Sequence, residues 1–266
     1  MANSAGRIRT GIGGWTYEPW GETFYPPDLP KKSQLNYASR QVTAIEVNGT
    51  FYRLQKPAVF AKWRDDAPED FVFSIKAPKY LTYRKVLAEA VPSMPRFLAS
   101  GLSELGPKLG PILWQLPPSL RFDAADIGAF LEALPRELEG LPLRHVLEVR
   151  HKSFVDAAYI ELARKHVVST VFAHTEEYPN FADVTGDFVY ARLRKAEASE
   201  PTGYSIPALQ AWADRAQVWA SGGSPADLPY VAKDKAAKQP RDVFVFFING
   251  AKERAPAAAR HLLTLI

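Results

Sequence analysis

The stretch Ala44-Ile45-Glu46-Val47-Asn48-Gly49-Thr50-Phe51-Tyr52 places an acid and an amide two residues apart inside an otherwise apolar run that favours a β-strand. On a strand, Glu46 and Asn48 leave the same face about 6–7 Å apart, and the turn formers Asn48 and Gly49 end the run. A similar order of residues returns at Val146-Leu147-Glu148-Val149-Arg150-His151. Polar groups at the ends of two buried strands indicate a site there.

On either side of these stretches, apolar runs alternate with segments of helical spacing. The apolar runs are continuous rather than alternating, which is typical of a parallel sheet covered by helices. We expect strands at residues 8–13, 44–48, 71–76, 109–115, 145–150, 167–173, 188–194 and 243–248. We expect helices at residues 31–40, 57–66, 95–105, 123–138, 156–165, 206–220 and 255–266.

This alternation predicts a TIM-type (β/α)8 barrel, formed as a single domain by all 266 residues. About 250 residues are enough for one such barrel. A doubly wound open sheet is the alternative. Residues 15–27, aromatic and rich in proline, should form a long ordered loop, and residues 221–241 a flexible insertion before the last strand.

The composition excludes several classes of site. The chain has no cysteine, so it has no disulfide, thiolate metal site or cysteine nucleophile. Its formal charge of +4 is a mild bias toward anionic partners. The first ten residues lack an apolar core and the longest apolar run, residues 243–248, is too short to span a bilayer. We therefore expect a cytoplasmic protein without a membrane partner, and we identify no protein partner.

In a (β/α)8 barrel the carboxyl ends of all strands lie on one face, which holds the active site in enzymes of this fold. Nearly every predicted strand ends in a polar residue. These residues are Glu46, Asn48, Lys76, Gln115, Glu148, Arg150, His151, His174, Arg192, Arg194 and Asn249. The sequence therefore predicts a polar, net cationic mouth on the barrel.

The residue types at this mouth indicate an anion site. We expect Glu46, Glu148 and His151 to be catalytic. Guanidinium groups bind phosphate or carboxylate oxygens in pairs, and aromatic rings can stack on a base or sugar. The expected substrate-binding residues are Asn48, Lys76, Gln115, Arg150, Arg192, Arg194, Asn249, Trp15 and Tyr17. The alternative is structural, with Glu148 neutralised by Arg150, Glu46 by Lys76, and the aromatic loop a hydrophobic plug.

No cofactor is predicted, because the chain lacks a phosphate-binding glycine loop, an HExxH pair, a GxSxG elbow and a GxGxxG turn. A multinuclear zinc centre is disfavoured, since the chain has five histidines and two of them reach the mouth. One Mg²⁺ on Glu46 and Glu148 remains an alternative.

Four segments resemble the YecE-like family, domain of unknown function 72. They are Gly14-Trp15-Thr16-Tyr17 with the aromatic residues after it, residues 46–52 (E-x-N-x-x-F-Y), residues 109–118 (L-G-x-x-L-x-Q-L-P-P), and residues 148–154 (E-x-R-H-x-S followed by an aromatic residue). The resemblance covers about residues 8 to 265 and implies a TIM-type barrel, but no reaction. Arg194-Lys195 departs from the family pattern, which commonly has His-Gly there, and adds positive charge.

Two functional hypotheses follow. The first is a hydrolase or lyase that acts on a phosphate-bearing small molecule or nucleic-acid fragment at the barrel mouth. The second is a non-catalytic protein that binds a nucleotide or nucleic acid at the same cationic mouth. A phosphate-independent sugar isomerase is a distant third, because its histidine and carboxylate metal cluster is thinly supplied.

Overall fold

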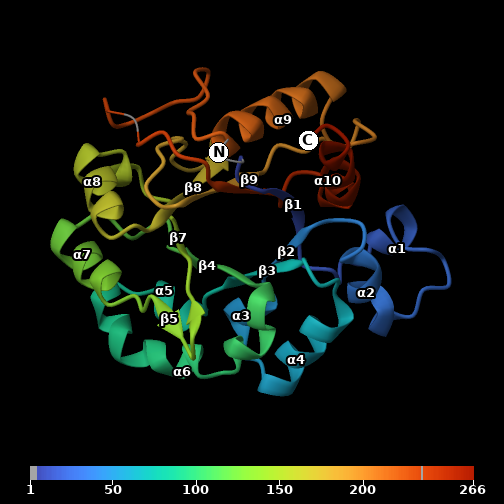
Figure 1. The fold of residues 1–266 in the computed structure, drawn as a ribbon, viewed down its shortest axis with the longest axis horizontal. Coiled ribbons are helices and arrows are strands. Elements are labelled where there is room, and N and C mark those ends of the chain that lie inside the picture. Colours follow the sequence, from blue (N-terminus) through green and yellow to red (C-terminus); the bar gives the residue numbers. More distant parts are fainter. Residues whose placement is uncertain (1–4, 235) are drawn as a thin grey trace.

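Eight parallel strands close into a barrel in the computed structural model, which describes residues 5–234 and 236–266 (Figure 1). The barrel strands are β1 (Ile8–Gly13), β2 (Ala44–Val47), β3 (Val72–Lys76), β4 (Leu109–Gln115), β7 (His145–Glu148), β8 (Ser169–His174), β9 (Phe188–Leu193) and β10 (Asp242–Phe247). Pairing of β1 with both β2 and β10 completes the circle. The predicted barrel is confirmed, and the open sheet is excluded.

Helices surround the strands on the outside of the barrel (Figure 1). They are α1 (Trp20–Thr23), α2 (Gln34–Ala38), α3 (Gly49–Tyr52), α4 (Pro57–Asp66), α5 (Lys79–Thr82), α6 (Met94–Leu98), α7 (Ala124–Glu132), α8 (Ala157–Lys165), α9 (Ile206–Ala220) and α10 (Ala255–Leu263). Short 3₁₀ turns are η1 (Lys31–Ser33), η2 (Leu87–Ser93), η3 (Leu102–Lys108), η4 (Lys152–Phe154) and η5 (Lys252–Arg254). A loop without a helix joins β8 to β9.

The interior of the barrel changes from apolar to polar along the strands. Its apolar cluster includes Ala44, Val72, Leu113, Val146, Tyr190 and Phe246. Two residues further along β2, β3, β4, β7 and β9, the same faces carry Glu46, Ser74, Gln115, Glu148 and Arg192, all of which are buried. Since side chains on a strand alternate between its faces, each two-residue step keeps the inward direction. The strands therefore place a polar layer above an apolar plug.

Several predicted helices are shorter than expected. Residues 31–40 form the turn η1 followed by α2, and residues 95–105 are divided between α6 and η3. The helix expected over residues 123–138 ends at Glu132, and a hairpin of β5 (Glu137–Leu138) and β6 (Leu141–Pro142) follows it. Its turn residues Glu139 and Gly140 both have positive φ, at 51° and 82°. Two-residue hairpin turns require this backbone conformation, so the turn geometry outweighs the apolar periodicity of the segment.

Residues 221–234 and 236–241 contain neither a helix nor a strand. The carboxylate of Asp183 accepts hydrogen bonds from the backbone amides of Val231 and Ala232 at 2.8 and 2.9 Å, and Arg241 is buried. These contacts hold two points of the segment against the barrel, and its flexibility stays a prediction. Among the described residues, no helix has both the length and the apolar character that crossing a membrane requires.

Candidate functional site

A buried ion-pair cluster lies at the carboxyl ends of β2, β7 and β9. The guanidinium of Arg192 donates to both carboxylate oxygens of Glu46, from Nε at 2.9 Å and Nη2 at 3.0 Å, and from Nη1 to Glu148 at 2.5 Å. Glu46 and Glu148 are fully buried, and Arg192 is 3% exposed. One arginine therefore joins two acids whose strands are separated by β3 and β4 in the barrel.

Further donors complete both carboxylates. Tyr190 donates its hydroxyl to Glu46 at 2.9 Å and also bonds to Ser74 at 2.8 Å. Gln115 donates to Oε2 of Glu148 at 2.6 Å, and Arg150 pairs with Oε1 at 3.1 Å. The expected pair of Glu148 with Arg150 is present, whereas Glu46 pairs with Arg192 instead of Lys76.

These contacts change the pKa values of Glu148 and Tyr190. Burial alone would raise the pKa of Glu148, but the positive charges of Arg192 and Arg150 outweigh it and lower that pKa to about 2. Burial and the nearby carboxylate of Glu46 raise the pKa of Tyr190 well above its ordinary value. At neutral pH Glu148 is therefore stabilised as a carboxylate by its partners, and Tyr190 stays a neutral donor.

Lys76 also belongs to this layer, and none of the described residues pairs a carboxylate with it. Its Nζ lies 4.2 Å from the ring centroid of Phe51 on α3, and the side chain is nearly buried. Within the described residues we find no hydrogen bond or ion pair from this Nζ, since Glu46 and Glu148 are engaged by arginines. Burial first, and then the charge of Arg192, lower the pKa of Lys76 to about 8.

A stack of side chains forms the rim above Glu148. The ring of Tyr178, from the loop after β8, lies 4.4 Å from the guanidinium carbon of Arg150 and 4.9 Å from that of Arg194. Arg194 also pairs with Glu177 at 3.3 Å, and Asn249 accepts from its Nη2 at 3.0 Å when its amide oxygen faces the arginine. The predicted residues Arg150, Arg194 and Asn249 are thus at the rim.

The aromatic loop packs beside β1 and β2. It contains the short helix α1, a departure from the expected loop that places Trp20 in the core. Trp15 packs on Trp63 with 5.2 Å between ring centroids, and Lys252 lies 4.6 Å from the ring of Tyr17. Trp15, Asn48 and Lys252 line a cleft of 210 Å³. Trp15 and Tyr17 are half-buried, so whether they stack on a ligand stays a prediction.

The two mouth histidines lie outside the ion-pair cluster. Nδ1 of His151 accepts from the backbone amide of Ser153 at 3.1 Å and caps η4, which places its proton on Nε2. His174 packs against Trp212, with 4.9 Å between ring centroids. Burial, followed by the charge of Lys195, lowers the pKa of His174 to about 4. His174 is therefore neutral at physiological pH.

The donor set does not fit a shared divalent cation. The guanidinium of Arg192 already bonds to both carboxylates that such an ion would bridge. In the described part of the chain, no group of three His, Cys, Asp or Glu side chains is arranged to hold a metal. We therefore assign no chemical step to a metal on Glu46 and Glu148.

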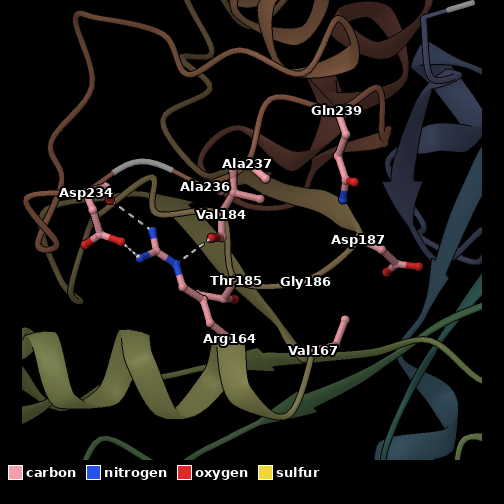
Figure 2. Close-up of a pocket in the computed structure, with 10 residues that line it drawn as sticks. All are labelled: Arg164, Val167, Val184, Thr185, Gly186, Asp187, Asp234, Ala236, Ala237 and Gln239. Atoms are coloured by element: carbon pink, nitrogen blue, oxygen red, sulfur yellow. Dashed lines mark hydrogen bonds and ion pairs between the residues drawn. The ribbon is translucent and has the colours of Figure 1, made fainter. Parts of the chain in front are cut away.

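Two other cavities differ from the mouth in charge and position. A groove of 790 Å³ after β3 and β4 has Arg84, Lys85 and Arg121 in its lining. Figure 2 shows a pocket before β8, β9 and β10, at the amino ends of the strands, where Arg164 pairs with Asp234 at 2.9 Å. It lies on the face opposite the ion-pair cluster, and its arginine is already neutralised.

Sequence reasoning missed Ser74, Tyr190 and Tyr178. Ser74 and Tyr190 stand two residues before Lys76 and Arg192 on β3 and β9, so the two-residue period of a strand could have identified them. Tyr178 lies in a loop without any period. Its contact with two arginines depends on the tertiary fold, and we see no local sequence signal for it.

The sequence is similar to one protein family and to two curated relatives. The family model described as "Protein of unknown function DUF72" matches residues 9–266. Over about 150 residues the chain is 31% identical to UPF0759 protein YecE of Escherichia coli (strain K12) and 25% identical to UPF0759 protein YunF of Bacillus subtilis (strain 168), covering 55% and 53% of this chain. These matches cover 50% and 52% of the two relatives, so the chain spans about half the length of the curated relatives it matches.

A solved structure of similar fold comes from Thermotoga maritima and is described as a DUF72 family protein. It superposes with a TM-score of 0.72 at 22% identity and covers 97% of this chain and 98% of its own. At this identity the likeness concerns the fold alone, and it agrees with the closed barrel described above.

Proposed function

This chain belongs to the DUF72 family, whose description records no activity, and we propose its function from the chemistry of the barrel mouth. We propose that it is an enzyme, a hydrolase or lyase, that acts on a phosphate-bearing small molecule or nucleic-acid fragment. One observation carries the proposal. The mouth holds three cations, Lys76, Arg150 and Arg192, against two buried carboxylates, and Lys76 has neither acid as its partner.

The side chains divide into a support and a binding surface. Glu46 and Glu148 fix the buried Arg192, which is bonded to both of them. Arg150 is half-buried and reaches the rim, so its guanidinium and the amine of Lys76 are the groups we assign to the anion. Asn48, Gln115, Arg194 and Asn249 are then assigned to orient the rest of the ligand.

The acid–base assignment stays a proposal. A carboxylate with a pKa of about 2 is a weak base at neutral pH, so Glu148 is assigned an electrostatic part in catalysis. His151 keeps Nε2–H available because its Nδ1 is occupied by Ser153. We therefore assign proton transfer to His151 and positioning of the cations to Glu46 and Glu148.

A specific observation favours the second candidate, a non-catalytic protein that binds nucleotides or nucleic acid. All four carboxylate oxygens of Glu46 and Glu148 accept hydrogen bonds from protein side chains. Neither acid is free to take a proton from a substrate or from water. In this second candidate the mouth binds an anion without turning it over.

A ligand screen tests the proposal. Purified protein is heated with nucleotides, sugar phosphates and short oligonucleotides, because a ligand that binds the native state raises the unfolding midpoint. We expect one phosphate class to raise the midpoint, and Arg150→Ala to weaken that binding roughly 10- to 100-fold, as loss of a charged hydrogen bond does.

Arg260→Ala is the matched control, because Arg260 is exposed on α10 and remote from the mouth. Each variant is compared with its own ligand-free midpoint, which separates binding from stability. Binding without product after prolonged incubation would favour the non-catalytic candidate. If Arg150→Ala and Arg260→Ala bind phosphate compounds equally well, the mouth is not the anion site.

A further inference from the structure

The amine of Lys76 is placed differently from the arginines around it. Lys76 ends β3 and is 8% exposed at the mouth of the barrel. The hydroxyl of Thr50 donates to its carbonyl oxygen at 2.7 Å, which ties the end of β3 to α3. The backbone under this lysine is therefore fixed, and Nζ lies over Phe51 instead of a carboxylate.

The neighbouring acids are not available to hold this amine as an ion pair. Glu46 gives both oxygens to Arg192, and Glu148 bonds to Arg192, Arg150 and Gln115. A lysine that only neutralises charge is normally paired when it is buried. Lys76 instead lies beside two guanidinium groups whose positive charges oppose its own protonation.

The environment of Lys76 destabilises the charged form of its amine. Burial and the charge of Arg192 lower its pKa to about 8, with Arg150 acting in the same direction and Glu46 and Glu148 opposing. Near neutral pH about a tenth of the molecules would then carry the free amine, far more than for an ordinary lysine. Only the neutral amine attacks a carbonyl carbon.

We propose that Lys76 is a nucleophile that forms an imine with the aldehyde or ketone group of a phosphate-bearing small molecule. The inference rests on the proposed function, because Arg150 at the rim supplies the phosphate contact and the amine of Lys76 is then assigned to the carbonyl group of the same compound. It goes beyond that function by naming the carbonyl compound as the substrate class and the lyase branch as the reaction.

The step balances without any co-reactant. The nitrogen lone pair of Lys76 bonds to the carbonyl carbon, and the C=O π electrons move to oxygen, which takes a proton from the amine. The remaining N–H proton then passes to this hydroxyl, which leaves as water and gives a C=N bond to Nζ. When the imine is protonated, the bond between the neighbouring carbon and the next, hydroxyl-bearing carbon can break. Its electron pair forms an enamine, and the hydroxyl-bearing carbon leaves as an aldehyde after its hydroxyl proton passes to water. Protonation of the enamine carbon gives the product imine, and hydrolysis of that imine restores the amine.

Reductive trapping tests the proposal on the wild-type protein. The protein is incubated with limiting glyceraldehyde 3-phosphate or dihydroxyacetone phosphate and sodium cyanoborohydride, which converts the imine into a stable secondary amine. Peptide mass mapping then measures the modification at each lysine. Lys79 is the internal control, because it is exposed on α5, three residues further along the chain.

We expect Lys76 to be modified at least tenfold faster than Lys79, with a rate that rises as the pH approaches 8. With unphosphorylated glyceraldehyde as the probe, most of the preference for Lys76 over Lys79 should disappear. Equal modification of Lys76 and Lys79 by the phosphorylated probes overturns the inference. The variants Lys76→Arg and Lys79→Met extend the test, since intact-protein mass should show the dominant adduct in Lys79→Met and not in Lys76→Arg.

Thermal shifts with the same compounds separate this inference from the proposed function. A raised midpoint without an adduct on Lys76 leaves the anion site standing and refutes the imine. If no phosphate compound raises the midpoint, or if Arg150→Ala leaves every such shift unchanged, the anion site is refuted, whatever the trapping shows.

Discussion

The most informative stability experiment replaces Arg192 with methionine. This change keeps much of the apolar volume but removes the guanidinium that joins Glu46 and Glu148 at 2.5–3.0 Å. The three hydrogen bonds that are lost are all between charged groups, and each such bond contributes roughly 1.5–3 kcal/mol. Their sum, about 4.5–9 kcal/mol, is comparable to the stability of a whole domain.

The actual loss is smaller, because a buried carboxyl can bind a proton instead of remaining charged. Protonation of one carboxyl at pH 7, from an ordinary pKa near 4.3, costs about 3–4 kcal/mol. Removing one partner of a buried pair costs about 3–5 kcal/mol in general. We therefore predict that Arg192→Met lowers the free energy of unfolding by about 3–5 kcal/mol at pH 7, and by less at pH 5, where protonation is easier.

Urea denaturation at the two pH values measures this loss, with the slope of the transition showing whether unfolding stays two-state. Lys62→Met is the control, because Lys62 pairs with Asp66 on the surface of α4 and should lose below about 1 kcal/mol. If Arg192→Met costs no more than Lys62→Met, the two carboxylates are hydrated and the buried cluster described here is wrong.

Three further predictions use the same denaturation assay. The pKa of Lys76 is lowered to about 8 in the folded protein, so its buried ammonium group destabilises the fold below pH 8, and this cost disappears as the pH rises toward 10.5. Lys76→Met should therefore be more stable than wild type by roughly 1–3 kcal/mol at pH 7 and should lose this advantage by pH 10.5. The pKa of Glu148 is lowered from 4.5 to about 2, so its contribution to the free energy of unfolding is complete above pH 4.5 and is lost as the pH falls from 4.5 to 2. The stability of Glu148→Gln should therefore fall less steeply with acid than that of wild type, and an equally steep fall would refute the ion pair. A Cβ atom on Gly11 would lie 2.3 Å from the carbonyl oxygen of Ala44, whereas one on Gly49 would meet nothing within 4 Å. Gly11→Ala should therefore lower the free energy of unfolding by at least about 1–3 kcal/mol, and Gly49→Ala by less than about 1 kcal/mol. Equal losses in the two variants would contradict the packing around β1.

The barrel could be predicted because its strands carry strong local signals. Parallel strands buried on both faces read as continuous apolar runs, and each of the eight expected runs overlaps a barrel strand. The helices α4 and α9 carry a proline in their first turn and match the expected ranges, because proline favours the first turn of a helix. The hairpin at residues 137–142 was missed because apolar spacing was given more weight than the Glu139-Gly140 turn.

The candidate site was predicted as a set of residues but not as a network of pairs. Polar residues at strand ends identified Glu46, Glu148 and Arg192, since all strand ends share one face of a barrel. Which acid meets which base depends on the order and stagger of the strands around the barrel. The strand order places β9 near enough for Arg192 to reach both acids, and the amine of Lys76 then lies over the ring of Phe51. No local sequence pattern shows this pairing.

The most direct test of the anion-binding mouth is a crystal structure of the protein with the phosphate compound that gives the largest thermal shift. We predict that phosphate oxygens lie within about 2.7–3.2 Å of the guanidinium nitrogens of Arg150, beside Lys76. A phosphate bound instead at the Arg164 pocket on the opposite face (Figure 2), with the mouth filled by water alone, would contradict the account.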